Sequence, residues 1–568
     1  MVSALPGETA ISAKRAELAG KGGIWGLLSN KKTSAIGLFA SLGGLVYGCE
    51  FMNGEDKVIP LENVETDSRV DNQGMFAQVL TMTSFKAATQ QYAAQTGIKQ
   101  GLLTSILELG AWVGTLFNGY LADAAGRRLT VLIAVVVFCV GVIVQACTQN
   151  KDYVFAGRFV TGLGVGSLSM IVPLYNAELA PPEIRGSLVA VQQLAITFGI
   201  MVSFWIGYGT NYIGGTGAGQ SDAAWLVPIC IQILPAVILA VGMMMFMPQS
   251  PRHLMNTGRD EECLQTLARL RNTSTDDLLV RIEYLEIKSL HLFEKETAAE
   301  KYPQWQDGSF KSRFQIGLHD YMSLVTNPSL FKRTSVACMI MVFQQWNGIN
   351  AINYYAPFIF EDMELPGNTT TLLATGVVGI VEFLFTIPAV LWVDQIGRKK
   401  ILIAGAAGMA ICHFIVAGII GAYQGEFGSH RAAGWTAIVF VWIFVINFAY
   451  SWGPVAWILN NFAVATATSP FLSSSALGAF IFFGCVTTIG IFYVIFMVPE
   501  TRGRTLEEMD ELFGTSGMAA ADAARKERIE REIGLLALVG VESADEKTGL
   551  EEATHSENTS VHKPAALE

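Results

Sequence analysis

The residues that most clearly suggest chemistry are four carboxamides in one short run of an apolar segment. Gln344, Gln345, Asn347 and Asn350 lie within "QQWNGIN", and Gly348 between them is a position where a helix can bend. A carboxamide donates and accepts hydrogen bonds at once, as a ligand ringed with hydroxyl groups requires. Amides also bond across membrane helices and hold them together, so a purely structural role is the alternative.

Three ionisable residues lie inside otherwise apolar segments: Glu108, Arg158 and Glu382. Charges are costly at bilayer depth, so ionisable groups found there are functional candidates. The sequence contains no nucleophile–base motif and no phosphate-binding loop, and its eight cysteines have no CxxC spacing. We therefore expect no enzyme activity, no cofactor and no metal site.

The composition indicates a membrane protein. Of the 568 residues, 51% are hydrophobic and 15% are charged, whereas about 25% of the residues in a soluble domain are charged. The apolar residues cluster into blocks of about 20, long enough to cross a lipid bilayer as a helix. The net charge of −11 argues against nucleic acid as a partner, and we expect no signal peptide.

We predict twelve spanning helices, the first interrupted and the eleventh weak. They are expected over residues 34–48, 102–122, 129–148, 154–176, 188–209, 225–247, 332–359, 371–393, 400–422, 434–457, 458–475 and 477–498. Basic clusters follow the ends of alternate spans, for example at Arg127, Arg252 and Arg398, and all fall on one side. By the positive-inside rule that side is the cytoplasm, together with both termini.

This pattern divides the chain into five parts. They are a cytoplasmic N-terminus (1–33), an N-terminal six-helix bundle (34–248), a cytoplasmic helical linker (249–331), a C-terminal six-helix bundle (332–513) and a cytoplasmic tail (514–568). The linker has the period of amphipathic helices. In the tail we expect a surface helix over residues 521–540 and disorder elsewhere.

An internal repeat relates the two bundles. "GYLADAAGRR" (119–128) follows the second span and "WVDQIGRKK" (392–400) follows the eighth, while "PQSPRHL" (248–254) and "PETRGRTLEEMDELF" (499–513) follow the sixth and the last. A motif repeated six spans apart predicts two homologous halves, an architecture that suits alternating access to a site between them.

These motifs, taken with "GRFVTGLGVG", "PLYNAELAPPEIRGSL", "QQLAITFG", "QQWNGINAINYYAP" and "GPVAW", resemble the sugar porter family of the major facilitator superfamily, and most of all its fungal monosaccharide transporters. The resemblance implies an all-α membrane protein with the major facilitator fold. It implies a monomer in the plasma membrane that moves a hexose or a pentose by alternating access. Its partners would be the sugar and the lipid bilayer.

The resemblance also assigns residues to roles. It implies substrate binding by Gln193, Ile196, Gln344, Gln345, Asn350, Trp457 and Asn461. It implies that Tyr354 and Tyr355 form an aromatic pair that closes the extracellular side. It also implies charged cytoplasmic networks that lock one state, formed by Asp123, Arg127, Arg128, Glu178, Arg185, Asp394 and Arg398. The basic loops orient the protein during membrane insertion in either case. The alternative is that this is their whole role.

Proton coupling stays open at this point. Proton-coupled relatives pair an Asp in the first span with the Arg that corresponds to Arg158, whereas this chain has Asn72 at the Asp position. Asn72 cannot carry a proton near neutral pH, which favours a facilitator. Glu382 lies in the middle of a span and could be the proton carrier or a hydrogen-bond acceptor for the sugar.

Two stretches depart from the family pattern. Without residues 49–71, and with one Tyr restored, the chain reads "GGLVYGYNQGMFAQVL", which resembles the first span of the family. The codons that can encode the two ends of 49–71 permit the boundary sequences of an intron, so the sequence is compatible with a translated intron there. We interpret 49–71 as a non-native insertion, with a genuine polar insertion as the alternative. Asp123 and Pro248 are 125 positions apart, whereas Asp394 and Pro499 are 105 apart, which indicates a deletion of about 20 residues near 457–460.

Two alternative functions stay open. The chain could be a membrane sugar sensor that does not transport, since sensors share this fold. It could also be the inactive product of a faulty gene model.

Overall fold

The structure is a computed structural model that describes residues 6–19, 23–51, 82–88, 98–215, 219–305, 310–349, 352, 368–423, 426–427, 429–453, 476–499 and 518–540. Within these ranges the regular elements are all helices. The chain divides into two compact units, a larger one of residues 21–253 and 321–509 and a smaller one of residues 1–20, 254–320 and 510–568. The two predicted bundles thus form one unit, and the linker forms another with both termini.

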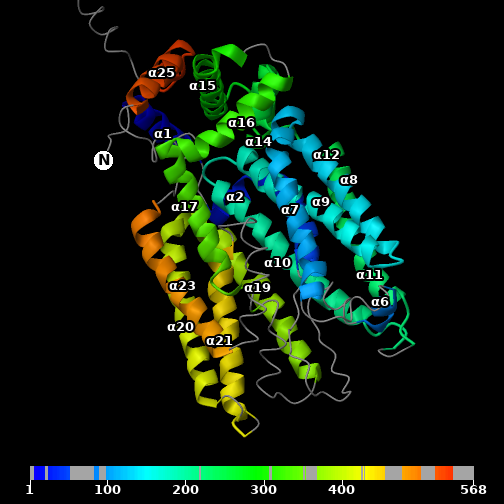
Figure 1. The fold of residues 1–568 in the computed structure, drawn as a ribbon. Helices are drawn as coiled ribbons and strands as arrows, with labels where there is room; N and C mark the ends of the chain where they lie inside the picture. Colours follow the sequence, from blue (N-terminus) through cyan, green and yellow to red (C-terminus); the bar gives the residue numbers. More distant parts are fainter. Residues whose placement is uncertain are drawn as a thin grey trace, which may run out of the picture. The chain divides into compact units, whose positions relative to one another are not determined.

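In the N-terminal half of the larger unit, α7, α8 and α9 pack together, and α10 packs on α4 (Figure 1). The helices of this half are α2 (Gly23–Ser29), α3 (Lys31–Ala40), α4 (Leu42–Phe51), α6 (Thr83–Ala88), α7 (Ile98–Ala125), α8 (Arg127–Ala146), α9 (Lys151–Leu179), α10 (Arg185–Thr210), α11 (Ala223–Ile231) and α12 (Ile233–Met245). A helix satisfies its own backbone hydrogen bonds, which an apolar surrounding demands.

In the C-terminal half, α20 packs on both α21 and α23, and the three lie side by side in Figure 1. The helices of this half are α17 (Pro328–Gln345), α19 (Asn368–Ile396), α20 (Arg398–Tyr423), α21 (Arg431–Tyr450) and α23 (Ala476–Met497). The halves meet where α19 packs on α10, with the Phe198 and Phe383 rings 5.3 Å apart.

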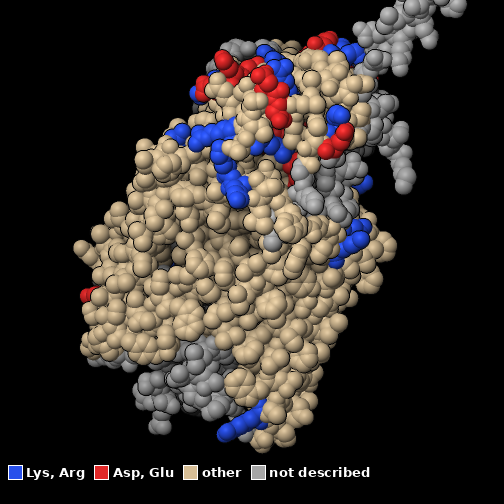
Figure 2. All heavy atoms as spheres, turned by 180° about the vertical axis from the view of Figure 1, so that it is seen from behind, with Lys and Arg blue, Asp and Glu red and all other residues tan. Residues whose placement is uncertain are grey.

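Seven helical stretches of the described residues are long and apolar enough to cross a membrane: 127–146, 151–179, 185–210, 223–245, 398–423, 431–450 and 477–497. Each coincides with a predicted span. Figure 2 shows that uncharged residues cover almost all of the visible surface along these long helices. Such a surface suits contact with lipid, which offers a charge no solvation.

Three predicted spans differ in detail. The sixth is two helices that meet at Gln232, because Pro235 has no N–H to offer the carbonyl of Ile231. The first is likewise two helices, which meet at Ser41. In the seventh, α17 ends at Gln345 and helical residues recur at 349 and 352, while 353–359 lie outside the described residues. The eleventh span, 458–475, lies outside the described residues, as do 52–71 of the suspected insertion and 457–460 of the suspected deletion.

The repeated "D-x-x-G-R" motif forms the same turn twice. Gly126 and Gly397 occupy the same position of the motif, with φ of +84° and +98°. This is a region that favours glycine, because a Cβ would be strained there. Each glycine separates two helices, α7 from α8 and α19 from α20.

An equivalent hydrogen bond follows each turn. Arg128 donates to the carbonyl of Met244, and Lys399 donates to the carbonyl of Ile495 at 2.7 Å. Both acceptors stand four residues before the proline of their motif, "PQSPRHL" or "PETRGRTLEEMDELF". Two halves built alike down to single hydrogen bonds agree with the predicted internal repeat.

The smaller unit is helical in its described part. It contains α1 (Pro6–Leu18), α14 (Asp260–Arg271), α15 (Leu278–Lys301), η2 (Pro303–Trp305), α25 (Met518–Glu532) and α26 (Leu535–Leu538), and α13 (Pro251–Asn256) and α16 (Phe310–Thr326) lie at the boundaries between the units. α1 and α25 both pack on α15. Ile11, Ile282, Leu535 and Leu536 form one buried apolar cluster.

Ion pairs reinforce this packing. Arg15 of α1 bonds to Glu286 of α15 at 2.7 Å, and Arg528 of α25 bonds to Glu296 at 2.6 Å. The helix expected over 521–540 is therefore present as α25 and α26, packed on the linker instead of standing alone. Residues 541–568 lie outside the described part.

Candidate functional site

The amides of the seventh predicted span are buried. Gln344, Gln345 and Asn347 expose 3%, 7% and 2% of their surface. Gln344 Nε2 donates to the carbonyl of Trp452, at 2.9 Å, and lies 3.4 Å from the carbonyl of Gly453. This ties the end of α17 to the end of α21.

An amide of the other half reaches the same place. Gln193 on α10 is 5% exposed. A methyl group placed on Gly453 would lie 3.5 Å from Gln193 Nε2. Gln193 and Gln344, which belong to different halves and are far apart in sequence, therefore both lie beside Gly453.

Both of these amides keep an unused acceptor. Gln193 Oε1 and Gln344 Oε1 accept no hydrogen bond from the residues that the structure describes, and both atoms are buried. Asn347 Nδ2 likewise donates none among those residues. A buried polar atom without a partner costs about 1–3 kcal/mol. A ligand whose hydroxyl groups bond to these atoms would therefore be bound more tightly.

Ile196 contributes to packing between helices. It is 1% exposed, and its carbonyl oxygen would lie only 2.2 Å from a side-chain carbon placed on Gly48 of α4. This close approach of α10 to α4 holds the helix that carries Gln193.

Of the three ionisable candidates, two are buried, on different helices. Arg158 on α9 is 0% exposed and Glu382 on α19 is 3% exposed, whereas Glu108 on α7 is half-buried. The backbone carbonyl of Glu382 accepts from Thr386 Oγ1 at 2.7 Å. Glu382 precedes Phe383, whose ring packs against Phe198 of α10, so this carboxyl lies on the helix that joins the halves.

Three of the five residues expected in the charge network of the first half contact one another: Asp123, Arg127 and Glu178. Arg127 Nε and Nη2 lie 3.1 and 2.8 Å from Glu178 Oε1, and Arg127 Nη1 lies 3.1 Å from Asp123. Ser250 donates to the other carboxylate oxygen of Glu178. The network ties the start of α8 to the end of α9, while Arg128 bonds to Met244 instead, and Arg185 begins α10.

The matching network of the second half is less complete in the described residues. Arg398 begins α20 directly after the turn at Gly397, and Lys399 bonds to the carbonyl of Ile495. The backbone of Asp394 belongs to α19, but its side chain lies outside what the structure describes. The predicted roles of Asn72, Asn350, Tyr354, Tyr355, Trp457 and Asn461 also fall outside the described residues.

Two buried residues near the amides were not singled out from the sequence. Trp452 is 2% exposed and donates from its indole Nε1 to the carbonyl of Leu402 at 2.9 Å. His413 is 1% exposed and lies 2.7 Å from the carbonyl of Asn347. The sequence did contain signals for both residues: His413 is a lone histidine inside an apolar span, and Trp452 directly precedes "GP".

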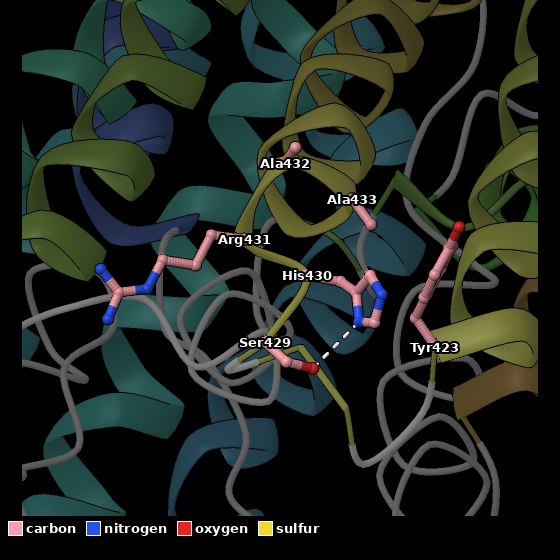
Figure 3. A pocket seen from close by; sticks show the side chains of 6 residues that line it. All are labelled: Tyr423, Ser429, His430, Arg431, Ala432 and Ala433. Atoms are coloured by element: carbon pink, nitrogen blue, oxygen red, sulfur yellow. Dashed lines mark hydrogen bonds between the residues drawn. The ribbon is translucent and has the colours of Figure 1, made fainter.

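A separate hollow lies at the turn between α20 and α21. Its volume is about 570 Å³, and it is lined by Tyr423, Ser429, His430, Arg431, Ala432 and Ala433. Figure 3 shows the His430 ring beside Tyr423 and Arg431 pointing away, with a hydrogen bond of 3.0 Å between Ser429 and His430. None of the candidate amides lines it, so the amide cluster remains the candidate site.

The chain is similar to known membrane transporters. The sequence profile of the family described as "Sugar (and other) transporter" matches residues 72–461 and 458–513. A low-affinity glucose transporter of Kluyveromyces lactis is 32% identical over 450 residues, which cover 74% of each chain. A quinate permease of Neurospora africana is 30% identical over 458 residues, which cover 74% of this chain and 81% of that one.

The fold matches solved structures of a bacterial transporter. The proton:xylose symporter XylE, bound to 6-bromo-6-deoxy-D-glucose, has a TM-score of 0.64 at 25% identity, covering 85% of this chain and 99% of that one. The inward open conformation of XylE from E. coli scores 0.54, also at 25% identity, covering 85% and 100%. These relatives are transporters and permeases, not enzymes. The chain therefore belongs to the sugar transporter family and is a multi-pass membrane protein with the all-α fold of the major facilitator superfamily.

Proposed function

We propose that this protein carries a monosaccharide, a hexose or a pentose, across the plasma membrane by alternating access. The observation that carries the proposal is the meeting of Gln193 and Gln344 at Gly453, one amide from each half. A ligand held between two halves can be exposed to either side in turn when one half rocks against the other.

The unused acceptors distinguish ligand binding from helix association. If the amides served only to hold helices together, both ends of each would be expected to find partners. Gln344 Nε2 does so, but its Oε1 and that of Gln193 do not within the described part. Sugar hydroxyls are donors that could satisfy both oxygens.

The relatives support a polyhydroxylated substrate of small size. Their names specify glucose, xylose and quinate. The substrate panel should therefore contain labelled glucose, xylose and quinate, because a quinate-specific uptake would place the chain with the permeases and overturn the monosaccharide assignment.

Uptake in a cell that lacks its own hexose transporters tests the proposal. Replacing Gln193 or Gln344 by Ala should raise KM by about tenfold, the effect of losing one buried hydrogen bond of about 1.4 kcal/mol. Gln145→Leu is the matched control, because this buried amide bonds to Thr161 within the first half, at 2.7 Å. An equal rise of KM in all three variants would remove the assignment of the site.

Glu382 decides between a facilitator and a proton symporter. Sugar addition to cells in a lightly buffered medium should make the medium more alkaline if a proton accompanies the sugar. Glu382→Gln should abolish that change while leaving sugar-driven exchange intact. Alkalinisation that survives in this variant would exclude Glu382 as the carrier.

We infer that residues 49–71 are foreign to the fold and that about 20 residues are missing near 457–460. In support, the family match begins at residue 72 and is divided at residues 458–461. Sequencing the transcript across codons 45–75 and 450–465 tests this inference. A mature message that encodes both stretches as they stand in this chain would overturn it. Uptake should therefore be measured with this chain and with a repaired gene. Sugar binding by the repaired protein without uptake would favour a sensor.

For the orientation, we propose that both termini lie in the cytoplasm. The basic turns at Arg127 and Arg398 begin α8 and α20 at equivalent ends of the two halves, as the positive-inside rule requires.

A further inference from the structure

We infer that His413 is a positioning residue, whose imidazole holds the break after α17 and so fixes the amides Gln344 and Gln345. The inference rests on the proposed function, because it assigns a role within the same site. The bond between His413 and the break is a separate observation and can be tested without any sugar.

The break itself is defined by three neighbouring residues. The N–H of Trp346 bonds to the carbonyl of Val342 at 2.9 Å and is the last helical bond of α17. Asn347 Oδ1 then accepts from the N–H of Ile349 at 3.1 Å, and Gly348 has φ of +92°. The chain therefore leaves the helix directly after the two glutamines.

At this break the carbonyl oxygen of Asn347 has a partner on another helix. His413 Nε2 lies 2.7 Å from that oxygen. A carbonyl can only accept, so Nε2 carries the hydrogen and the imidazole donates. A buried carbonyl with no donor would be costly at this position.

Three phenylalanine rings surround the imidazole of His413. Its ring centroid lies 4.4 Å from that of Phe444, 5.8 Å from that of Phe480 and 6.0 Å from that of Phe483. A side-chain carbon on Gly348 would lie 3.2 Å from His413 Cε1, so the ring also packs directly on the bend.

One helix thus supports both ends of the amide site. α20 carries His413, which holds the bend after α17, and Leu402, whose carbonyl accepts from the indole of Trp452. The carbonyl of Trp452 in turn accepts from Gln344. Leu402 and His413 are eleven residues apart on the helix, about 16 Å along its axis. α20 is therefore the scaffold on which Gln344 is oriented.

Two substitutions separate donation from packing. His413→Gln keeps an N–H near the position of Nε2 but loses the ring, whereas His413→Phe keeps the ring among the three phenylalanines but loses the donor. If His413 positions the break, the Gln variant keeps KM for labelled glucose or xylose near the wild-type value, and the Phe variant raises it by about tenfold. If the ring only packs, the order of the two variants is reversed, which would overturn the inference.

Hydrogen exchange of the amides in residues 342–349, measured on the full chain in detergent, gives a readout without sugar. We expect faster exchange in His413→Phe than in His413→Gln and the wild type; equal exchange in all three overturns the inference. If wild type takes up no sugar, the proposed function fails while this comparison still decides on His413. Should either variant fail to fold, ¹⁵N-imidazole spectra of the wild type remain decisive, since a ring protonated only at Nδ1 would contradict the bond.

Discussion

Glu178→Gln tests whether the buried charge network holds the first half together. Arg127 and Glu178 expose only 8% and 3% of their side chains. Removing one partner of a buried pair costs about 3–5 kcal/mol, because a charge stays behind uncompensated. Asp123 lies 3.1 Å from the same guanidinium and retains part of the compensation, so we expect about 2–3 kcal/mol. Gln also keeps the shape of Glu, so packing stays constant.

The assay is thermal unfolding of the purified protein in detergent. Glu178→Gln should lower the melting temperature by several degrees. Asp123→Asn is the control, because the Asp123 side chain is 75% exposed and an exposed pair contributes about 0–1 kcal/mol. The argument from burial is wrong if Asp123→Asn lowers the melting temperature as much as Glu178→Gln does. It is also wrong if Glu178→Gln has the same melting temperature as the wild type.

Three further predictions concern the turn, the termini and a thiol. Gly397→Ala should destabilise the protein by about 1–2 kcal/mol in thermal unfolding, because alanine is strained at positive φ, and Gly397→Asn should cost less; equal melting temperatures would contradict this. Arg15→Ala removes the 2.7 Å bond to Glu286 and should expose α1 to limited proteolysis, whereas Lys14→Ala, which affects an exposed pair, should not; unchanged digestion in both would refute the docking of α1. Burial raises the pKa of the Cys263 thiol to about 12, so only about one in 10⁴ molecules carries the thiolate at pH 8; mass spectrometry should find Cys263 unalkylated in the native protein and alkylated after denaturation.

The helices and the repeat could be predicted from the sequence, because both depend on residues that are adjacent in the chain. Each long helix follows from a block of apolar residues that must satisfy its own backbone in lipid. The turn at Gly126 recurs at Gly397 since the same short motif stands at both places. The predicted sixth span missed the break at Gln232, although Pro235 is the local signal for it.

The sequence by itself determined that this is an all-helical membrane protein of two related halves, with amides in the seventh span and a charge motif at each repeated turn. Only the tertiary structure decided that Gln193 and Gln344 lie beside Gly453, that His413 reaches the carbonyl of Asn347, and that α1 and α25 share the surface of α15. The physical reason is one of range. Spans and turns depend on a few adjacent residues, whereas contacts between distant helices depend on how each helix is rotated and crossed against its neighbours, which no local pattern specifies.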